Sequence, residues 1–153
     1  MIRVSASTFR WSLAVPLALA VSVLGATTNA MAQEDFMKST AVYKQVGDLK
    51  IHADLYRPAT KDVLPVVVWI HGGALINGHR AGVSGRVRNW ARENECALVS
   101  IDYRLAPETK LPGIIEDLED AFKWIRGEGA KQFHLDPKRV AVTGGSAGGC
   151  LTF

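Results

Sequence analysis

Cysteine is scarce in this sequence of 153 residues, and its scarcity argues against two classes of protein. Cys96 and Cys150 are the only two cysteines, and both stand among apolar neighbours. That setting favours two buried free thiols over a disulfide framework, although export to an oxidising compartment leaves oxidation open. No Cys/His cluster has the spacing of metal ligands, so we expect no metal site and no cofactor.

An excess of charge of one sign is also lacking, since positive and negative residues are nearly balanced. The chain has 18 Lys and Arg against 15 Asp and Glu, a net charge of +3. Arg3 and Arg10 belong to the first 32 residues, so the remainder carries only 16 − 15 = +1. Nothing in this balance calls for a nucleic-acid partner. A hydrophobic content of 48% and a charged content of 22% are typical of a globular domain.

One apolar run stands out, and it lies at the N-terminus. A basic start at Arg3 and Arg10 precedes an apolar stretch over residues 11–24, and Ala30-Met31-Ala32 is a small-x-small cleavage site. This order predicts a secretory signal peptide over residues 1–32 and a mature domain over residues 33–153. A membrane anchor is the alternative, but the run is short for a span and contains Pro16. We therefore expect an exported protein, periplasmic or extracellular, with no stable membrane anchor after cleavage.

The rest of the chain alternates strand and helix patterns. Two strands are predicted around a Gly47-Asp48 turn, with Leu49 to Tyr56 alternating apolar and polar residues and so having one wet face. Three further runs are apolar on both faces, as in strands covered by helices on both sides: residues 66–70, 97–101 and 140–142. Helices are predicted over residues 84–94, where Val87, Trp90 and Ala91 form an apolar stripe, and over residues 114–126. The layout predicts an α/β fold with a mostly parallel sheet and an N-terminal antiparallel hairpin.

Four carboxylates crowd the second predicted helix. We interpret Glu116, Asp117, Glu119 and Asp120 as favourable partners of the positive end of the helix dipole, in preference to catalytic acids. Gly127 and Gly129 are expected to end this helix.

A Gly-x-Ser-x-Gly pentad follows the last apolar run. Gly144 to Gly148 surround Ser146, and small residues that can begin a helix come next. This pattern predicts a nucleophile elbow, in which the serine lies on a strained strand-to-helix turn and Gly144 and Gly148 avoid a collision of side chains. The alternative is a Gly-rich loop that binds a phosphate or has no ligand.

A second Gly-rich turn strengthens the interpretation of the pentad as a nucleophile elbow. The strand of residues 66–70 leads directly into His71-Gly72-Gly73-Ala74. Adjacent glycines let backbone N–H groups approach a substrate closely, and such groups stabilise the oxyanion of ester hydrolysis. Two such turns, each at the C-terminal end of a buried strand, are more specific than either alone.

These segments resemble the α/β-hydrolase family. Residues 69–74, Asp102 to Glu108, and residues 136–139 leading into the pentad are similar to the hormone-sensitive-lipase-like branch of bacterial carboxylesterases and acetyl esterases. The resemblance covers roughly residues 40–153. It implies an α/β-hydrolase fold and hydrolysis of a small-molecule ester through an acyl-enzyme.

The resemblance also assigns roles to individual positions. It implies that Ser146 is the nucleophile and that the N–H of Ala147 is one oxyanion donor. The loop donors fall at Gly73 and Ala74, with Gly72 as a further candidate. His71 supports the loop, and Tyr103, Arg104 and Glu108 form a structural turn. Ala74 departs from the family's third glycine, and Gly145 from the acidic residue that many relatives carry before the nucleophile.

The histidine and the acid of a catalytic triad are not found where the resemblance places them. The family's order is Ser, then Asp or Glu, then His, yet no acid or histidine follows Ser146. All four histidines precede Ser146: His52, His71, His79 and His134. We therefore expect the N-terminal part of an esterase, ending just after the elbow and inactive by itself. The alternatives are a peptidase of the prolyl-oligopeptidase type and a non-catalytic binding protein with the hydrolase fold.

Overall fold

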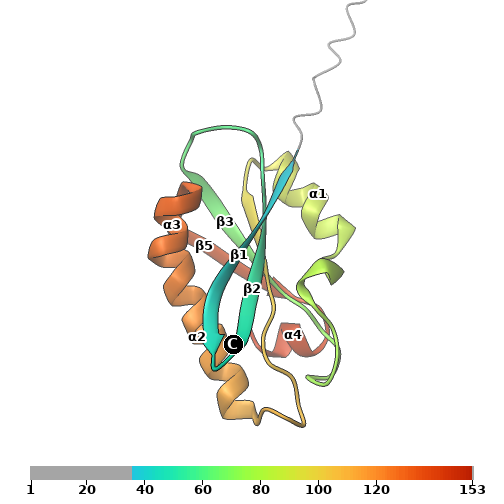
Figure 1. Ribbon diagram of the computed structural model, residues 1–153. Helices are drawn as coiled ribbons and strands as arrows, with labels where there is room; N and C mark the ends of the chain where they lie inside the picture. Colours follow the sequence, from blue (N-terminus) through green and yellow to red (C-terminus); the bar gives the residue numbers. More distant parts are fainter. Residues whose placement is uncertain (1–35, 153) are drawn as a thin grey trace, which may run out of the picture. The chain divides into compact units, whose positions relative to one another are not determined.

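The computed structural model describes residues 36–152, and the predicted signal peptide of residues 1–32 lies outside them. Within this range the elements alternate much as the sequence predicts (Figure 1). No helix in residues 36–152 combines the length and apolarity needed to cross a membrane.

The N-terminal hairpin is confirmed. Strand β1 (Met37–Val46) pairs antiparallel with β2 (Leu49–Arg57), with Gly47 in the turn at a φ of 58°. β1 begins at Met37, four residues before the predicted start at Ala41, because residues 37–40 complete the ladder along β2. Lys38 there pairs with Tyr56 in register and forms an ion pair with Asp54, 2.8 Å from Nζ to Oδ2. Pairing thus outweighs the low strand preference of the local sequence.

The sheet has the order β1-β2-β4-β3-β5. Strand β3 (Leu64–Ile70) lies parallel to both β4 (Ala97–Ile101) and β5 (Leu135–Gly144), whereas β2 meets β4 antiparallel. The sheet is therefore mixed: parallel over β4, β3 and β5, and antiparallel through the hairpin. β5 forms one edge of the sheet of residues 36–152.

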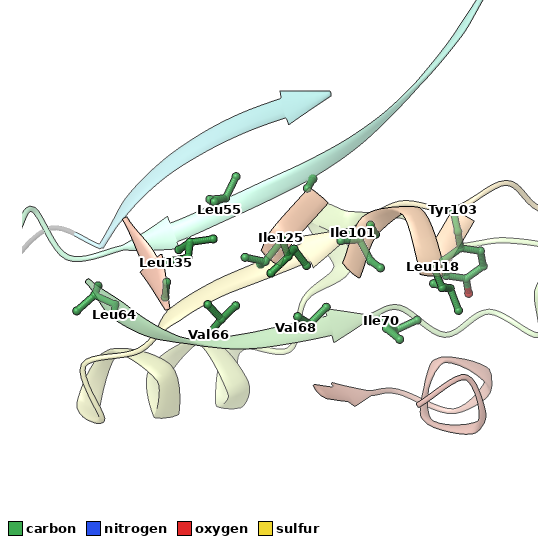
Figure 2. Packing of buried hydrophobic residues seen from close by; sticks show 14 of the residues in the cluster. Leu55, Leu64, Val66, Val68, Ile70, Ile101, Tyr103, Leu118, Ile125 and Leu135 are labelled. Carbon is green, nitrogen blue, oxygen red and sulfur yellow. The ribbon is translucent and has the colours of Figure 1, made fainter. Parts of the chain in front are cut away.

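Helices cover both faces of the sheet at β3 and β4, which explains why these strands are apolar on both sides. Residues 140–142 of β5 were expected to be covered in the same way, but Ala141 and Val142 are exposed, because β5 lies at the edge of the described sheet. Helix α1 (Gly85–Glu93) lies on one face, and α2 (Leu111–Arg126) and α3 (Glu128–Phe133) lie on the other (Figure 1). Successive residues of β3 point to opposite faces. Val66 and Val68 pack with Ile125 of α2 (Figure 2), and Val67 and Trp69 belong to the core on the α1 side.

Three expectations for side chains on the two faces need correction. Trp90 was expected to face the core with Val87 and Ala91, but it is 50% exposed because it lies over β5, at the edge of the sheet. Asp54 and Tyr56 were placed on a wet face of β2, yet both are buried. The 3-10 helix η1 (Arg80–Gly82) covers that face, and Arg80 Nε donates to Asp54 Oδ1 at 2.9 Å.

The carboxylates of α2 also differ from expectation. The helix begins at Leu111, so none of the four acids lies in its first turn, and the dipole interpretation is wrong. Asp117 is instead fully buried. Its carboxylate accepts from Arg104 N at 2.9 Å and from Arg104 Nε at 2.8 Å, and Lys44 Nζ lies 2.8 Å away. Asp117 thus joins β1, α2 and the segment that follows β4.

Helix α3 was not predicted. Gly127 ends α2 as expected, but Gly129 lies inside α3 and does not end a helix. A methyl carbon built on Gly129 would lie 3.0 Å from the Trp124 carbonyl oxygen, so close packing and not chain termination requires glycine there.

Candidate active site

The two Gly-rich turns lie side by side because they follow neighbouring parallel strands. Ile70, the last residue of β3, is the register partner of Gly144, the last residue of β5. One residue further along the chain, Gly145 N donates a hydrogen bond to Ile70 O at 3.2 Å, so the pairing of the two strands extends into the turn after β5. The carboxyl ends of parallel strands meet at one edge of a sheet, which is where α/β folds place ligand sites.

Ser146 lies in the turn between β5 and the helix that follows it. Its backbone has φ 52° and ψ −119°, and the short helix α4 (Ala147–Cys150) begins directly after it. The side chain is exposed, and within residues 36–152 no other side chain forms a hydrogen bond with its Oγ. This geometry matches the predicted elbow, in which the chain reverses tightly and presents the serine.

Glycines on both sides of Ser146 make the turn possible. A methyl carbon on Gly144 would collide with the backbone of Gly148, and one on Gly148 would collide with the carbonyl oxygens of Ile70 and His71. Gly148 is buried at this contact. Close approach of backbone to backbone therefore requires glycine at both positions.

Substitution of Gly148 by alanine should lower the free energy of unfolding by about 1–3 kcal/mol, the usual cost of overpacking. The added methyl group has no room against the end of β3. Urea titration followed by circular dichroism measures the change. Gly85→Ala is the matched control, because no atom lies within 4 Å of the added carbon at Gly85. Equal stability of the two variants would contradict the close packing of the elbow on β3.

The loop after β3 closes onto the elbow. Gly73, Ala74 and Leu75 all have positive φ, at 114°, 53° and 65°. The Gly73 carbonyl accepts from Ile76 N and Asn77 N, both at 3.0 Å, so the loop forms a tight turn. A methyl carbon on Gly72 would collide with the Gly145 carbonyl and lie 3.2 Å from Ser146 Cβ. The loop therefore touches the residue that carries the predicted nucleophile.

The three amides predicted as oxyanion donors have no partner in the described part of the chain. There the N–H groups of Gly73, Ala74 and Ala147 donate to no other residue, and the same holds for those of Gly72, Leu75 and Ser146. Backbone amides are usually paired unless solvent or a ligand satisfies them. Of the three predicted donors, two come from the loop after β3 and one from the elbow, two turns that the approach of Gly72 to Gly145 and Ser146 brings together.

His71 is held in a supporting position. Its ring is buried, and Nδ1–H donates to the Gly72 carbonyl at 2.8 Å. The Tyr103 ring stacks on it with centroids 4.3 Å apart, and Tyr103 Oη–H donates to His71 O at 2.8 Å. Burial lowers the pKa of His71 and favours the neutral ring. These contacts fix the start of the loop.

The segment after β4 holds the loop at two further points. Ala106 N donates to Leu75 O at 2.8 Å, and Arg80 N donates to Asp102 Oδ1 at 2.7 Å. Arg104 in turn is anchored to Asp117. Tyr103 and Arg104 therefore make the scaffold contacts expected of them, whereas Glu108 is exposed. Arg80 and Asp102 were not singled out from the sequence, because their contact joins residues 22 positions apart.

Gly145 and Cys150 show how side chains fit around the elbow. A methyl carbon on Gly145 would lie 3.2 Å from Trp69 Cη2, so the indole occupies the space of a larger side chain at this position. The expectation of two buried thiols is correct for Cys96 and wrong for Cys150, which is exposed. Cys150 lies on α4 and faces a hollow beside the loop.

Comparison with known proteins places these turns in a family. A family described as BD-FAE matches residues 53–153. The carboxylesterase NlhH of Mycobacterium tuberculosis is 39% identical over 113 residues, covering 74% of this chain and 35% of the relative. The chain thus spans about a third of the length of this curated relative.

Solved structures agree with the sequence matches. The hyperthermophilic esterase of the archaeon Pyrobaculum calidifontis superimposes with a TM-score of 0.69 at 36% identity, over 80% of this chain and 40% of that one. A bacterial heroin esterase gives a TM-score of 0.67 at 34% identity, over 76% of this chain and 37% of that one. The chain therefore belongs to the α/β-hydrolase family, in its hormone-sensitive-lipase-like esterase branch.

Proposed function

We propose that this chain carries the nucleophile and the oxyanion hole of a carboxylic-ester hydrolase. The observation that carries the proposal is the meeting of an exposed Ser146 at positive φ with three unpaired amides from two adjacent turns. Ser146 is the nucleophile. Gly73, Ala74 and Ala147 bind the oxyanion, Gly72 lines the same loop, and His71, Gly144 and Gly148 hold the backbone in place.

The reaction proceeds through an acyl-enzyme. Ser146 Oγ attacks the ester carbonyl carbon while a base takes its proton, and the carbonyl oxygen becomes an anion held by the free amides. The alcohol leaves with a proton as the carbonyl re-forms, and water then releases the acid by the same steps. We assign His71 a supporting role and not that of the base, because its ring is buried and stacked on Tyr103 and forms no hydrogen bond with Ser146 within residues 36–152. We propose that the histidine and acid belong to the part of the longer relatives that this chain does not span.

Neither alternative function gains support from the relatives. Those found by sequence include a carboxylesterase, an esterase and an arylesterase, which favours ester over peptide substrates. The free amides argue against a purely binding role, since they offer a site for a developing charge.

The experiment that tests this function compares two proteins. The 153-residue chain should hydrolyse p-nitrophenyl acetate little above the buffer rate, because no side chain in residues 36–152 is bonded to Ser146 as a base. An extended protein, in which the part of NlhH after the matched segment follows this chain, should hydrolyse it readily. Turnover by the chain alone, lost in Ser146→Ala, would reveal a base among its own residues, with His79 and His134 as candidates.

We also propose export through the signal peptide of residues 1–32. Expressed with its own N-terminus in a bacterium, the protein should appear in the periplasm or medium beginning at Gln33. N-terminal sequencing of the mature form measures this. Replacing residues 15–18 by charged residues should abolish export, and a cytoplasmic protein that retains Met1 in both cases would overturn the proposal.

A further inference from the structure

Strand β5 forms one edge of the sheet of residues 36–152, and half of it lacks the features that usually protect an edge. An edge strand presents N–H and C=O groups to which a further strand can bind, and proline, lysine or a bulge usually prevents this. Pro137, Lys138 and Arg139 supply such protection in the first half of β5. Residues 140–143 contain neither proline nor charge. The second half of β5 is therefore open to pairing with another strand.

A groove follows this open stretch on each face of the sheet. On one face a groove of about 720 Å³ lies between β5 and α2, lined by Val140 and Val142. On the other face a groove of about 370 Å³ lies between β5 and α1, lined by Ala141, Thr143 and the half-exposed Trp90. Apolar side chains that gather at one edge on both faces indicate a protein-binding surface more strongly than scattered ones do.

The residues of α2 beside β5 carry charge in a self-complementary order. Those that line the groove are Glu119, Phe122, Lys123 and Arg126, so the acid comes first and the bases follow. Within residues 36–152 neither Glu119 nor Arg126 takes part in an ion pair. A two-fold axis that reverses α2 at a point between Phe122 and Lys123 would bring each Glu119 opposite the partner's Arg126. The free charges therefore suit a second copy of the same helix.

We propose that a second copy of this chain binds at the open half of β5, with the two β5 strands antiparallel about a two-fold axis through Ala141. Such a contact uses the same surface on both copies and closes after two chains. With the axis perpendicular to the sheet, each face continues across the contact and α2 lies beside the partner's α2. The proposal concerns the 153-residue chain and does not depend on the function of Ser146.

The strand and the helix place the axis at the same point. When Ala141 lies opposite the partner's Ala141, Val140 lies opposite the partner's Val142, so both valines meet a valine across the strands. Val140 and Val142 are also the residues of β5 that line the groove with Glu119 and Arg126. One axis therefore satisfies the apolar pairs of the strand and the charge pairs of the helix.

A disulfide across the axis tests this register directly. Opposite residues of antiparallel strands have Cα atoms about 4.5–5.5 Å apart, which a disulfide can bridge. Ala141→Cys, combined with Cys150→Ser, should therefore give a covalent dimer in mild oxidant, measured by non-reducing electrophoresis. Arg139→Cys in the same background is the matched control, because its two copies would lie four residues apart along the strands, about 14 Å. Equal yields at the two positions, or no dimer with Ala141→Cys, would overturn the register.

Sedimentation velocity over a range of concentrations measures the association without a cross-link. The 153-residue chain and a chain that begins at Gln33 should both form dimers. Ala141→Lys places two like charges at the axis and protects the edge, so it should raise the dissociation constant at least about 100-fold. Dimers of the full chain alone would assign the contact to residues 1–32 and overturn the proposal. A monomer at every concentration, or a series of larger species, would overturn it as well.

A charge exchange on α2 tests the symmetry of the contact. Glu119→Arg and Arg126→Glu should each raise the dissociation constant about tenfold, because the dimer contains two copies of the pair. The double variant should return it to within about threefold of the parent, since the pairs re-form in reverse. Lys61→Glu is the control, because Lys61 is exposed and lies outside both grooves. Variants with the circular dichroism spectrum of the parent that show no such rescue would exclude the two-fold pairing of α2.

Discussion

Replacing Ser146 by alanine in the extended protein should lower kcat for p-nitrophenyl acetate by about 10⁶, the cost of removing the nucleophile of a serine hydrolase. The activity that remains comes from binding and from the free amides, about 10³–10⁴ over water. The side chain is exposed and makes no hydrogen bond within residues 36–152, so its loss leaves no cavity and no unpaired group. Steady-state kinetics measures the loss of activity.

The thermal midpoint of the Ser146→Ala protein separates chemistry from folding. It should equal that of the parent or exceed it slightly. A folded variant that keeps its kcat would show that the ester is cleaved by another nucleophile, and the exposed Cys150 would then be the first to examine.

Replacing Asp117 by alanine should lower the free energy of unfolding by about 3–5 kcal/mol, as expected when one partner of a buried ion pair is removed. The change leaves Lys44 and Arg104 facing each other without the carboxylate that separates them. Urea titration of the parent and the variant measures the difference. The contacts of Arg104 with the segment after β4 should loosen as well.

Glu116 provides the control on the same helix. Its side chain is 60% exposed, and it lies 3.4 Å from Lys44 and 3.3 Å from Arg104. Surface ion pairs of this kind contribute about 0–1 kcal/mol, so Glu116→Ala should change little. Equal losses from the two substitutions would mean that helix charge, and not the buried cluster, provides the stability.

The same cluster sets a direction for the pH dependence of stability. Burial by itself would raise the pKa of Asp117, but hydrogen bonds from Arg104 and Lys44 outweigh burial and hold that pKa below its usual 3.8. A carboxyl group whose pKa is lower in the folded state than in the unfolded state contributes its full stabilisation at pH values above the unfolded-state pKa. That stabilisation is lost as the pH falls through the folded-state pKa. Stability should therefore decline below about pH 4, and less steeply in Asp117→Ala.

Local patterns in the sequence were sufficient to predict that each strand exists, though not where β1 and β5 begin, and to predict the elbow turn. β3 was predictable because Val66 to Ile70 are apolar on both faces. This pattern is expected of a strand that has helices on both of its faces. The elbow was predictable because the tight turn at Ser146 leaves no room for side chains at Gly144 and Gly148. Both signals are complete within ten residues, so no knowledge of the rest of the fold is needed to read them.

What could not be predicted depends on residues far apart in the chain. Asp54 alternates like a solvated residue, and only the placement of η1 over β2 buries it. Asp117 lies among three other acids, and nothing in their spacing distinguishes the one that meets Lys44. Helix α3 has six residues between glycine and histidine, too few to show a period. The hollow lined by Ala74, Leu111 and Cys150 combines three segments and has no sequence pattern of its own.

The backbone at Ser146 has a consequence for how the sequence can drift. Four of the five residues in positions 144, 145, 146, 148 and 149 are glycine, and the exception has φ 52° and ψ −119°. Non-glycine residues in such conformations cost about 1–3 kcal/mol. Random mutation filtered by stability alone would therefore move position 146 toward glycine, in a neighbourhood where glycine is already common. Under the proposed function, the hydroxyl group of Ser146 is what glycine could not supply at this position.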